Sequence, residues 1–116
     1  LHTPLDDSTR AIIGAPELAM MKSTAILINT CRGPVVDEAA LHDALKNHTI
    51  WGAGLDVFEE EPTPDNNPIR QLDNVVMAPH IAGQTSESYP RRTRYAINNF
   101  IRVSQGETPT NLITPA

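Results

Sequence analysis

Three short apolar runs, separated by segments with helical periodicity, constrain the fold of this chain more than any other feature. The runs are AILIN (residues 25–29), WGAGLDVF (51–58) and VVMAPH (75–80), and each has the length of a buried strand. A helix is expected after the first run, because Asp37 is suited to cap it and apolar residues recur at helical spacing up to about Asn47. Strands that alternate with helices of about ten residues predict βαβ units and an α/β fold with a parallel sheet.

The other segments are less regular. Residues 9–22 are expected to form a helix in two pieces, separated by a glycine and a proline. Residues 58–74, rich in proline and carboxylates, predict a loop. Residues 85–105 have a helical apolar stripe, and Pro90 should either delay the start of that helix or kink it. The tail, residues 106–116, is expected to be extended.

Charge and composition exclude several classes of protein. The net charge of −5 repels phosphate backbones and anionic lipid headgroups, so we expect neither a nucleic acid nor a membrane as a partner. No apolar run approaches the ~20 residues of a membrane span. The single cysteine, Cys31, cannot form an internal disulfide, which favours a reducing, cytoplasmic setting. No pair of histidines has metal-site spacing, so no metal is expected.

Polar residues follow the predicted strands at the points where the strands end. Parallel strands place all their carboxyl ends at one edge of the sheet, which is where open α/β sheets bind ligands. Four clusters should therefore meet there: His2-Thr3-Pro4, Asn29-Thr30-Cys31-Arg32-Gly33, Asp56 with the acidic loop after it, and Pro79-His80.

Arg32 is the candidate anion-binding residue of these clusters. Its guanidinium is permanently charged and has the planar fork that holds a carboxylate with two hydrogen bonds. Gly33 beside it should leave room for a ligand to approach the backbone. The alternative is an exposed loop arginine paired with a nearby Asp or Glu.

His80 is the candidate acid/base, because an imidazole can both donate and accept a proton near neutral pH. A structural or solvated histidine is the alternative. One carboxylate of Glu59-Glu60-Glu61 could orient His80, but the residues alone leave open which one, or whether the loop is only solvated. Asp56 needs a hydrogen-bonding partner, either a ligand amide or a neighbouring helix N-terminus. A nucleophilic role for Cys31 is disfavoured, because no base of known proximity supports it.

Four stretches of the sequence occur in the order and spacing of a known family: LHTPLDDSTRAIIG, MKSTAILINTCRGPVVDEAAL, GAGLDVFEEEP and APHIAG. On these motifs the chain resembles the D-isomer-specific 2-hydroxyacid dehydrogenases, which include phosphoglycerate, formate and glyoxylate/hydroxypyruvate dehydrogenases or reductases. The resemblance covers essentially the whole chain.

The resemblance implies a catalytic role for three residues. Arg32, in the N-x-x-R-G motif, should bind the substrate carboxylate and help to polarise the reacting carbonyl. Glu61, just before proline in the E-E-P motif, is implied as the catalytic glutamate. His80, in the P-H motif, would be the general acid/base. The implied substrate is a small 2-hydroxy or 2-keto acid.

The resemblance also implies a cofactor, NAD or NADP, with the choice between them left open. Asp56 should accept a hydrogen bond from the nicotinamide carboxamide, and residues 80–83 should close over the ring. The implied cofactor-binding residues are Thr3, Thr30, Cys31, Arg32, Asp56, His80, Ala82 and Gly83.

The implied fold is the second half of a Rossmann-type doubly wound parallel sheet. Residues 1–84 would be a partial dinucleotide-binding domain, because the sequence has no G-x-G-x-x-G loop to seat a pyrophosphate. Residues 85–116 would be a crossover helix and the last segment of a largely absent substrate domain. The isolated chain is therefore expected to be inactive, and the full-length protein to be a cytoplasmic homodimer. The alternative function is an NAD(H)-sensing, corepressor-like binding protein on the same scaffold.

Overall fold

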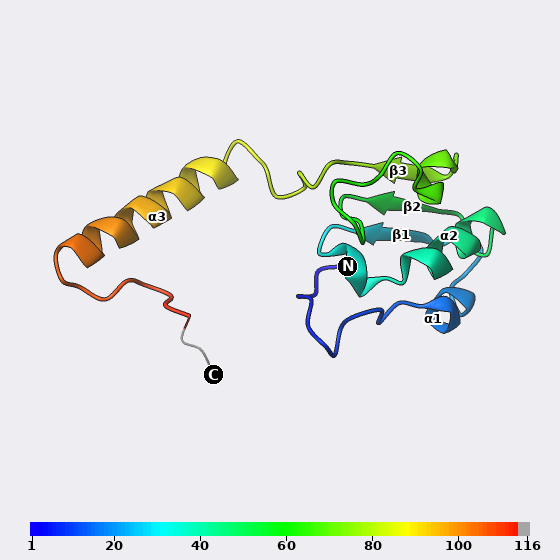
Figure 1. The fold of residues 1–116 in the computed structure, drawn as a ribbon, viewed down its shortest axis with the longest axis horizontal. Helices are drawn as coiled ribbons and strands as arrows, with labels where there is room; N and C mark the ends of the chain where they lie inside the picture. Colours follow the sequence, from blue (N-terminus) through cyan, green and yellow to red (C-terminus); the bar gives the residue numbers. More distant parts are fainter. Residues whose placement is uncertain (114–116) are drawn as a thin grey trace. The chain divides into compact units, whose positions relative to one another are not determined.

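The computed structural model describes residues 1–113 and divides the chain into two compact units (Figure 1). The first unit is Leu1–Ala82, and the second begins at Gly83. The last three residues of the predicted extended tail, 114–116, lie outside the described residues. No helix of the described part of the chain is both long and apolar enough to cross a membrane.

A parallel sheet of three strands forms the first unit. Its order is β1 (Ile26–Asn29), β2 (Gly52–Leu55) and β3 (Val75–Met77), and Ala53 pairs with Leu27 on one side and Val75 on the other. Polar residues lie at the ends of the first two strands: Asn29 is the last residue of β1, and Asp56 directly follows β2. The prediction of an α/β fold with a Rossmann-like parallel sheet is confirmed.

Two helices pack beside this sheet. In α2 (Glu38–Lys46) Asp37 is the N-cap, its Oδ1 accepting a hydrogen bond from the Ala40 N–H at 3.0 Å, and Asn47 is the C-cap. The predicted helix bounds are thus confirmed. A shorter helix, α1 (Ala15–Ala19), starts at the proline-containing turn and contacts α2.

The prediction of a second helical piece before α1 is wrong. Residues 7–11 form turns, because the Asp6 carboxylate accepts hydrogen bonds from the N–H groups of Ser8 and Thr9. Such local bonds offer the backbone an alternative to a helix. Ile13 then forms a parallel bridge with Val36, which ties this segment to the turn before α2.

The predicted loop between β2 and β3 contains one short 3₁₀ helix, η2 (Pro68–Gln71), and a second, η1 (Gly33–Val35), follows β1. The peptide bond between Glu61 and Pro62 is cis.

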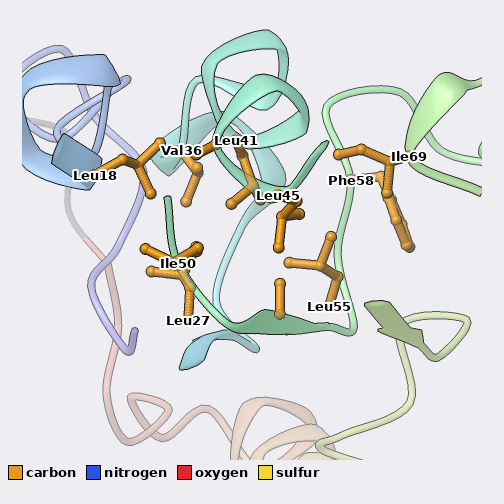
Figure 2. Packing of buried hydrophobic residues seen from close by; sticks show 11 residues of the cluster. Leu18, Leu27, Val36, Leu41, Leu45, Ile50, Leu55, Phe58 and Ile69 are labelled. Atoms are coloured by element: carbon orange, nitrogen blue, oxygen red, sulfur yellow. The ribbon is translucent and has the colours of Figure 1, made fainter. Parts of the chain in front are cut away.

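The core lies between α2 and one face of the sheet (Figure 2). Leu41 and Leu45 of α2 pack in one cluster with Leu27 and Leu55 of the strands. Further members are Leu18, Val36, Ala44, Ile50, Ala53, Phe58 and Ile69. This packing fixes the first turn of α2 and the ends of β1 and β2 relative to one another, and those are the places from which the polar clusters extend.

The second unit is built on α3 (Ser88–Ser104). Pro90 lies in its first turn, where its missing N–H costs no helical hydrogen bond, so the helix starts late. The tail folds back on α3: Asn99 donates to the Thr110 carbonyl at 3.2 Å and accepts from the Thr110 N–H at 2.9 Å.

Candidate active site

Asn29, the last residue of β1, organises the turn that carries Arg32. Its buried side chain accepts hydrogen bonds from the backbone N–H and the Sγ of Cys31, at 3.1 and 3.0 Å, and donates to the Arg32 carbonyl at 3.0 Å. The sequence places Asn29 in the polar cluster after the first strand but indicates no role for it. The feature of the sequence that could have indicated this role is a polar side chain at an inward-facing position of an apolar strand.

The Arg32 side chain is exposed and makes one hydrogen bond, from Nη1 to the carbonyl oxygen of Cys31 at 2.6 Å. None of the ion pairs among residues 1–113 involves this guanidinium. The alternative in which a neighbouring carboxylate neutralises Arg32 is therefore not observed. The Arg32 guanidinium therefore places a permanent positive charge at the carboxyl edge of the sheet. Most of its N–H donors make no hydrogen bond within the described residues.

Gly33 allows two backbone segments to cross. A Cβ at this position would lie 1.9 Å from both the carbonyl carbon and the oxygen of Phe58, so only glycine fits. The expectation that Gly33 leaves room for a ligand is wrong, because the backbone of Phe58 fills that space. The crossing instead brings the acidic loop against the Arg32 turn.

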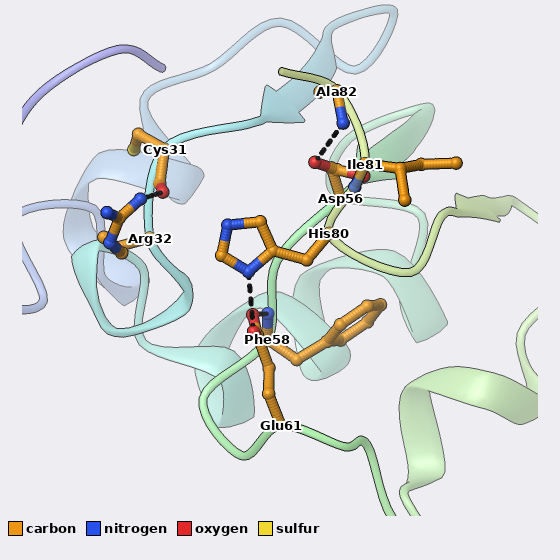
Figure 3. A network of polar contacts seen from close by, with 8 residues as sticks. All are labelled: Cys31, Arg32, Asp56, Phe58, Glu61, His80, Ile81 and Ala82. Carbon is orange, nitrogen blue, oxygen red and sulfur yellow. Dashed lines mark hydrogen bonds and ion pairs between the residues drawn. The ribbon is translucent and has the colours of Figure 1, made fainter. Parts of the chain in front are cut away.

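Glu61 and His80 form a hydrogen-bonded pair, with 2.7 Å between Glu61 Oε2 and His80 Nδ1 (Figure 3). The other carboxylate oxygen, Oε1, accepts from the Phe58 N–H at 3.0 Å. Of the three consecutive glutamates, Glu61 is thus the one that contacts the imidazole. His80 Nε2 lies on the far side of the ring from the carboxylate.

Two opposing influences act on the Glu61 carboxyl. Partial burial raises its pKa, but the hydrogen bonds from His80 and from the Phe58 N–H, together with the charges of His80 and Arg32, outweigh burial. The net effect lowers the pKa of Glu61 below its ordinary value. Glu61 is therefore ionised at neutral pH, as a carboxylate that orients an imidazole must be.

Asp56 holds the backbone that follows His80. Asp56 is 5% exposed, and its carboxylate accepts hydrogen bonds from the N–H groups of Ile81 and Ala82, each at 2.8 Å. The His80 N–H donates to the Asp56 carbonyl oxygen at 2.8 Å. These bonds fix His80 at φ +54°, a left-handed conformation that residues other than glycine seldom adopt and that often occurs at functional sites.

The N-terminal segment reaches the same edge of the sheet. The Leu1 nitrogen donates to the Ile28 carbonyl at 2.6 Å, and Thr30 Oγ1 lies 3.5 Å from His2 Nδ1. This places the segment that carries Thr3 beside the end of β1. Gly83 opens the second unit, where its carbonyl accepts from Ser88 Oγ at 2.7 Å.

The four polar clusters thus form two groups. His2 lies beside Thr30 of the second cluster, and Asp56 and Glu61 contact the segment that carries His80. Asp56, Glu61 and His80 line one pocket of about 660 Å³. Among the residues that the structure describes, no group of three or more His, Cys, Asp or Glu side chains could hold a metal ion. A paired imidazole and carboxylate near a guanidinium can exchange a proton with an anionic substrate.

A family model described as D-isomer specific 2-hydroxyacid dehydrogenase, NAD binding domain, matches residues 1–82. The chain belongs to this family. Within the D-isomer-specific 2-hydroxyacid dehydrogenases, it is 50% identical over 113 residues to a glyoxylate reductase of Korarchaeum cryptofilum. The alignment covers 97% of this chain and 34% of the relative, so the chain spans about a third of the length of such relatives.

Two solved structures of the family superimpose on the chain. One is a D-lactate dehydrogenase with NAD⁺ from Lactobacillus jensenii, with a TM-score of 0.88 and 34% identity over 99% of this chain and 38% of that one. The other is a D-isomer specific 2-hydroxyacid dehydrogenase from Xanthobacter autotrophicus Py2 in complex with NADPH and MES, with a TM-score of 0.80 and 41% identity. That match covers 98% of this chain and 46% of the other. The prediction of NAD or NADP is confirmed for the family, because the matched domain is described as NAD binding.

Proposed function

We propose that this chain supplies part of the active site of an NAD(P)-dependent oxidoreductase that interconverts a D-2-hydroxy acid and a 2-keto acid. The observation that carries the proposal is the 2.7 Å pair of Glu61 and His80, with the Arg32 guanidinium close enough for its charge to act on Glu61. The names of the relatives, a glyoxylate reductase and a D-lactate dehydrogenase, support a small 2-keto acid as the substrate class.

His80 and Glu61 move the proton. In reduction His80 donates a proton from Nε2 to the carbonyl oxygen of the keto acid, and in oxidation it removes the hydroxyl proton. Glu61 holds Nδ1 and stabilises the protonated ring. The nicotinamide, when bound, supplies or accepts the hydride.

Arg32 binds the substrate carboxylate. Its hydrogen bond to the Cys31 carbonyl anchors one edge of the guanidinium, and the remaining donors make the two-point contact with the carboxylate. The positive charge also polarises the adjacent carbonyl. Together these contacts orient the substrate with its carbonyl oxygen toward His80.

The hydrogen-bonding groups at this edge of the sheet fit the nicotinamide end of the cofactor. Thr30 offers a hydroxyl, and the Asp56 oxygens each hold one backbone N–H and keep lone pairs for a carboxamide. Thr3, Cys31, Ala82 and Gly83 complete the proposed lining. The sequence has no G-x-G-x-x-G loop, so the pyrophosphate must be held by residues outside this chain.

The rest of the proposal concerns the whole enzyme. Residues 1–84 form part of its dinucleotide-binding domain, and 85–116 form the crossover helix and last segment of the substrate domain. We propose a cytoplasmic homodimer as the full-length state, and no turnover by the 116-residue chain alone. The chain spans about a third of the length of the glyoxylate reductase relative, which supports the expectation that it does not turn over substrate alone.

The test uses a full-length enzyme that carries this chain, either its parent or a hybrid in which the chain replaces the matched segment of the Korarchaeum relative. Nicotinamide absorbance is followed with NADH and NADPH separately, against glyoxylate, hydroxypyruvate and pyruvate. Oxidation that depends on one keto acid supports the proposal. Cofactor binding without turnover on any keto acid would instead favour the NAD(H)-sensing, corepressor-like function.

Replacement of Arg32 by Lys in this enzyme should raise the substrate KM about ten- to a hundredfold, with a smaller change in kcat. Lysine keeps the charge but loses the fork, and one charge-assisted hydrogen bond has a free energy of ~1.5–3 kcal/mol. Steady-state kinetics measures the effect, with Arg10→Lys as the control at an exposed arginine of the same unit. An unchanged KM in Arg32→Lys would exclude the two-point contact.

Replacement of Glu61 by Gln should change the acidic limb of the rate–pH profile, which protonation of the Glu61 carboxylate sets, with little change in the substrate KM. The depressed pKa of Glu61 means that its stabilising charge is present at neutral pH and is lost only as the pH falls through that lowered value. Glutamine removes the charge at every pH. Rate–pH profiles measure the shift, and Glu60→Gln, at the exposed neighbour, should leave the profile in place.

A further inference from the structure

The loop that carries Glu61 is hydrogen-bonded at two points to one side chain, that of Glu38. Glu38 Oε2 accepts a hydrogen bond from the backbone N–H of Glu59 at 2.8 Å. Its other oxygen, Oε1, accepts from Asn67 Nδ2 at 2.7 Å. The two anchored residues lie on either side of Glu61 in the sequence, two residues before it and six after it.

Both partners of these bonds are held in place. Glu38 is the first residue of α2, whose Leu41 and Leu45 are buried in the core, so the carboxylate projects from a rigid base. Asn67 is 8% exposed, and its Oδ1 caps η2 by accepting from the Ile69 N–H at 3.0 Å. That cap leaves Asn67 Nδ2 directed at Glu38.

The position of Glu61 depends on the backbone between these anchors. Its carboxylate is bonded to the Phe58 N–H, one residue before the Glu59 anchor, and to His80. A shift of about 1 Å in this backbone would separate Glu61 from His80, and misplacements of that size can cost an enzyme about a hundredfold in rate.

We propose that Glu38 is a positioning residue that holds Glu61 against His80 by bonding Glu59 and Asn67. The proposal rests on the proposed function for its effect on turnover, but its geometric part can be measured without turnover. A residue with only a structural role, such as a carboxylate that favours a helix N-terminus, would change stability and leave the Glu61–His80 pair as it is.

The experiment measures the pair directly in the full-length enzyme. The ¹³C signal of the Glu61 side-chain carboxyl is titrated with pH, and its absence in Glu61→Gln assigns it. In Glu38→Ala the pKa of Glu61 should rise toward its ordinary value, because the hydrogen bonds that lower it are lost. Glu38→Gln, which retains one acceptor oxygen, should give an intermediate shift. Asp43→Ala removes an exposed carboxylate from the same helix and should give none.

The kinetic readout follows from the same geometry. Glu38→Ala should lower kcat about ten- to a hundredfold with little change in the substrate KM. The double variant Glu38→Ala/Glu61→Gln should be no slower than Glu61→Gln alone, because Glu38 acts through Glu61. An unshifted Glu61 titration in folded Glu38→Ala would overturn the proposal.

A second variant covers the case in which Glu38→Ala does not fold. Asn67→Asp keeps the Oδ1 cap on Ile69 but replaces the donor that faces Glu38 with an acceptor. It should shift the Glu61 titration in the same direction, and an unshifted titration would overturn the proposal here too. A shifted titration in an enzyme that turns over no keto acid would support the positioning role and reject the proposed function.

Discussion

Replacement of His80 by Asn in the full-length enzyme is expected to lower kcat by ~10²–10⁴-fold, because a positioned proton donor contributes about that much to the rate. Asparagine accepts the left-handed backbone that His80 occupies at φ +54°. Asparagine has no imidazole, so it can neither give a proton to the substrate nor take one from it. The expected loss is therefore in the proton-transfer step, and it should appear in kcat.

The chain provides a matched control for this substitution. His48 has the same left-handed φ of +54°, lies just after α2, and has no part in the candidate active site. His48→Asn should leave kcat unchanged and should unfold at nearly the same temperature as His80→Asn. If His80→Asn kept its kcat within about tenfold of the unmodified enzyme, His80 would not be the acid/base.

Local patterns in the sequence predicted the elements that position the site. The apolar runs, the Asp37 cap and the polar strand ends were enough to expect a parallel sheet with a site at its carboxyl edge. Residues 9–11 form turns where a helix was expected, because the competing bonds of the Asp6 carboxylate leave no mark on apolar periodicity.

Contacts between residues far apart in the sequence could not be predicted in this way. The residues alone do not say which of three glutamates is the partner of His80, whereas the resemblance to the family indicates Glu61. The 2.7 Å contact between Glu61 and His80 agrees with that choice. The bond from Asn67 to Glu38 joins residues 29 positions apart, and no local pattern indicates it. The contact between Gly33 and the Phe58 backbone could not be predicted either, because a glycine allows the close approach of a ligand or of another backbone segment equally well.

Gly33→Ala is expected to destabilise the enzyme by about 3 kcal/mol or more, near the upper end of the cost of forcing atoms into a packed site. The added Cβ would lie 1.9 Å from the Phe58 carbonyl carbon and oxygen and 2.5 Å from the Glu59 nitrogen. These are backbone atoms, so no side-chain rotation relieves the clash. The loop must move away from the Arg32 turn, and Glu61 moves with it.

Thermal unfolding followed by circular dichroism measures the loss, with Gly14→Ala as the control. Gly14 is also buried, but a Cβ there would have its nearest neighbour at 3.5 Å, an ordinary contact. Any Gly33→Ala enzyme that folds should also lose kcat, because the displaced loop carries Glu61 away from His80. Equal unfolding temperatures for the two variants would contradict the backbone crossing. A destabilised Gly33→Ala enzyme with full kcat would show instead that turnover does not require Glu61 to be held at this crossing.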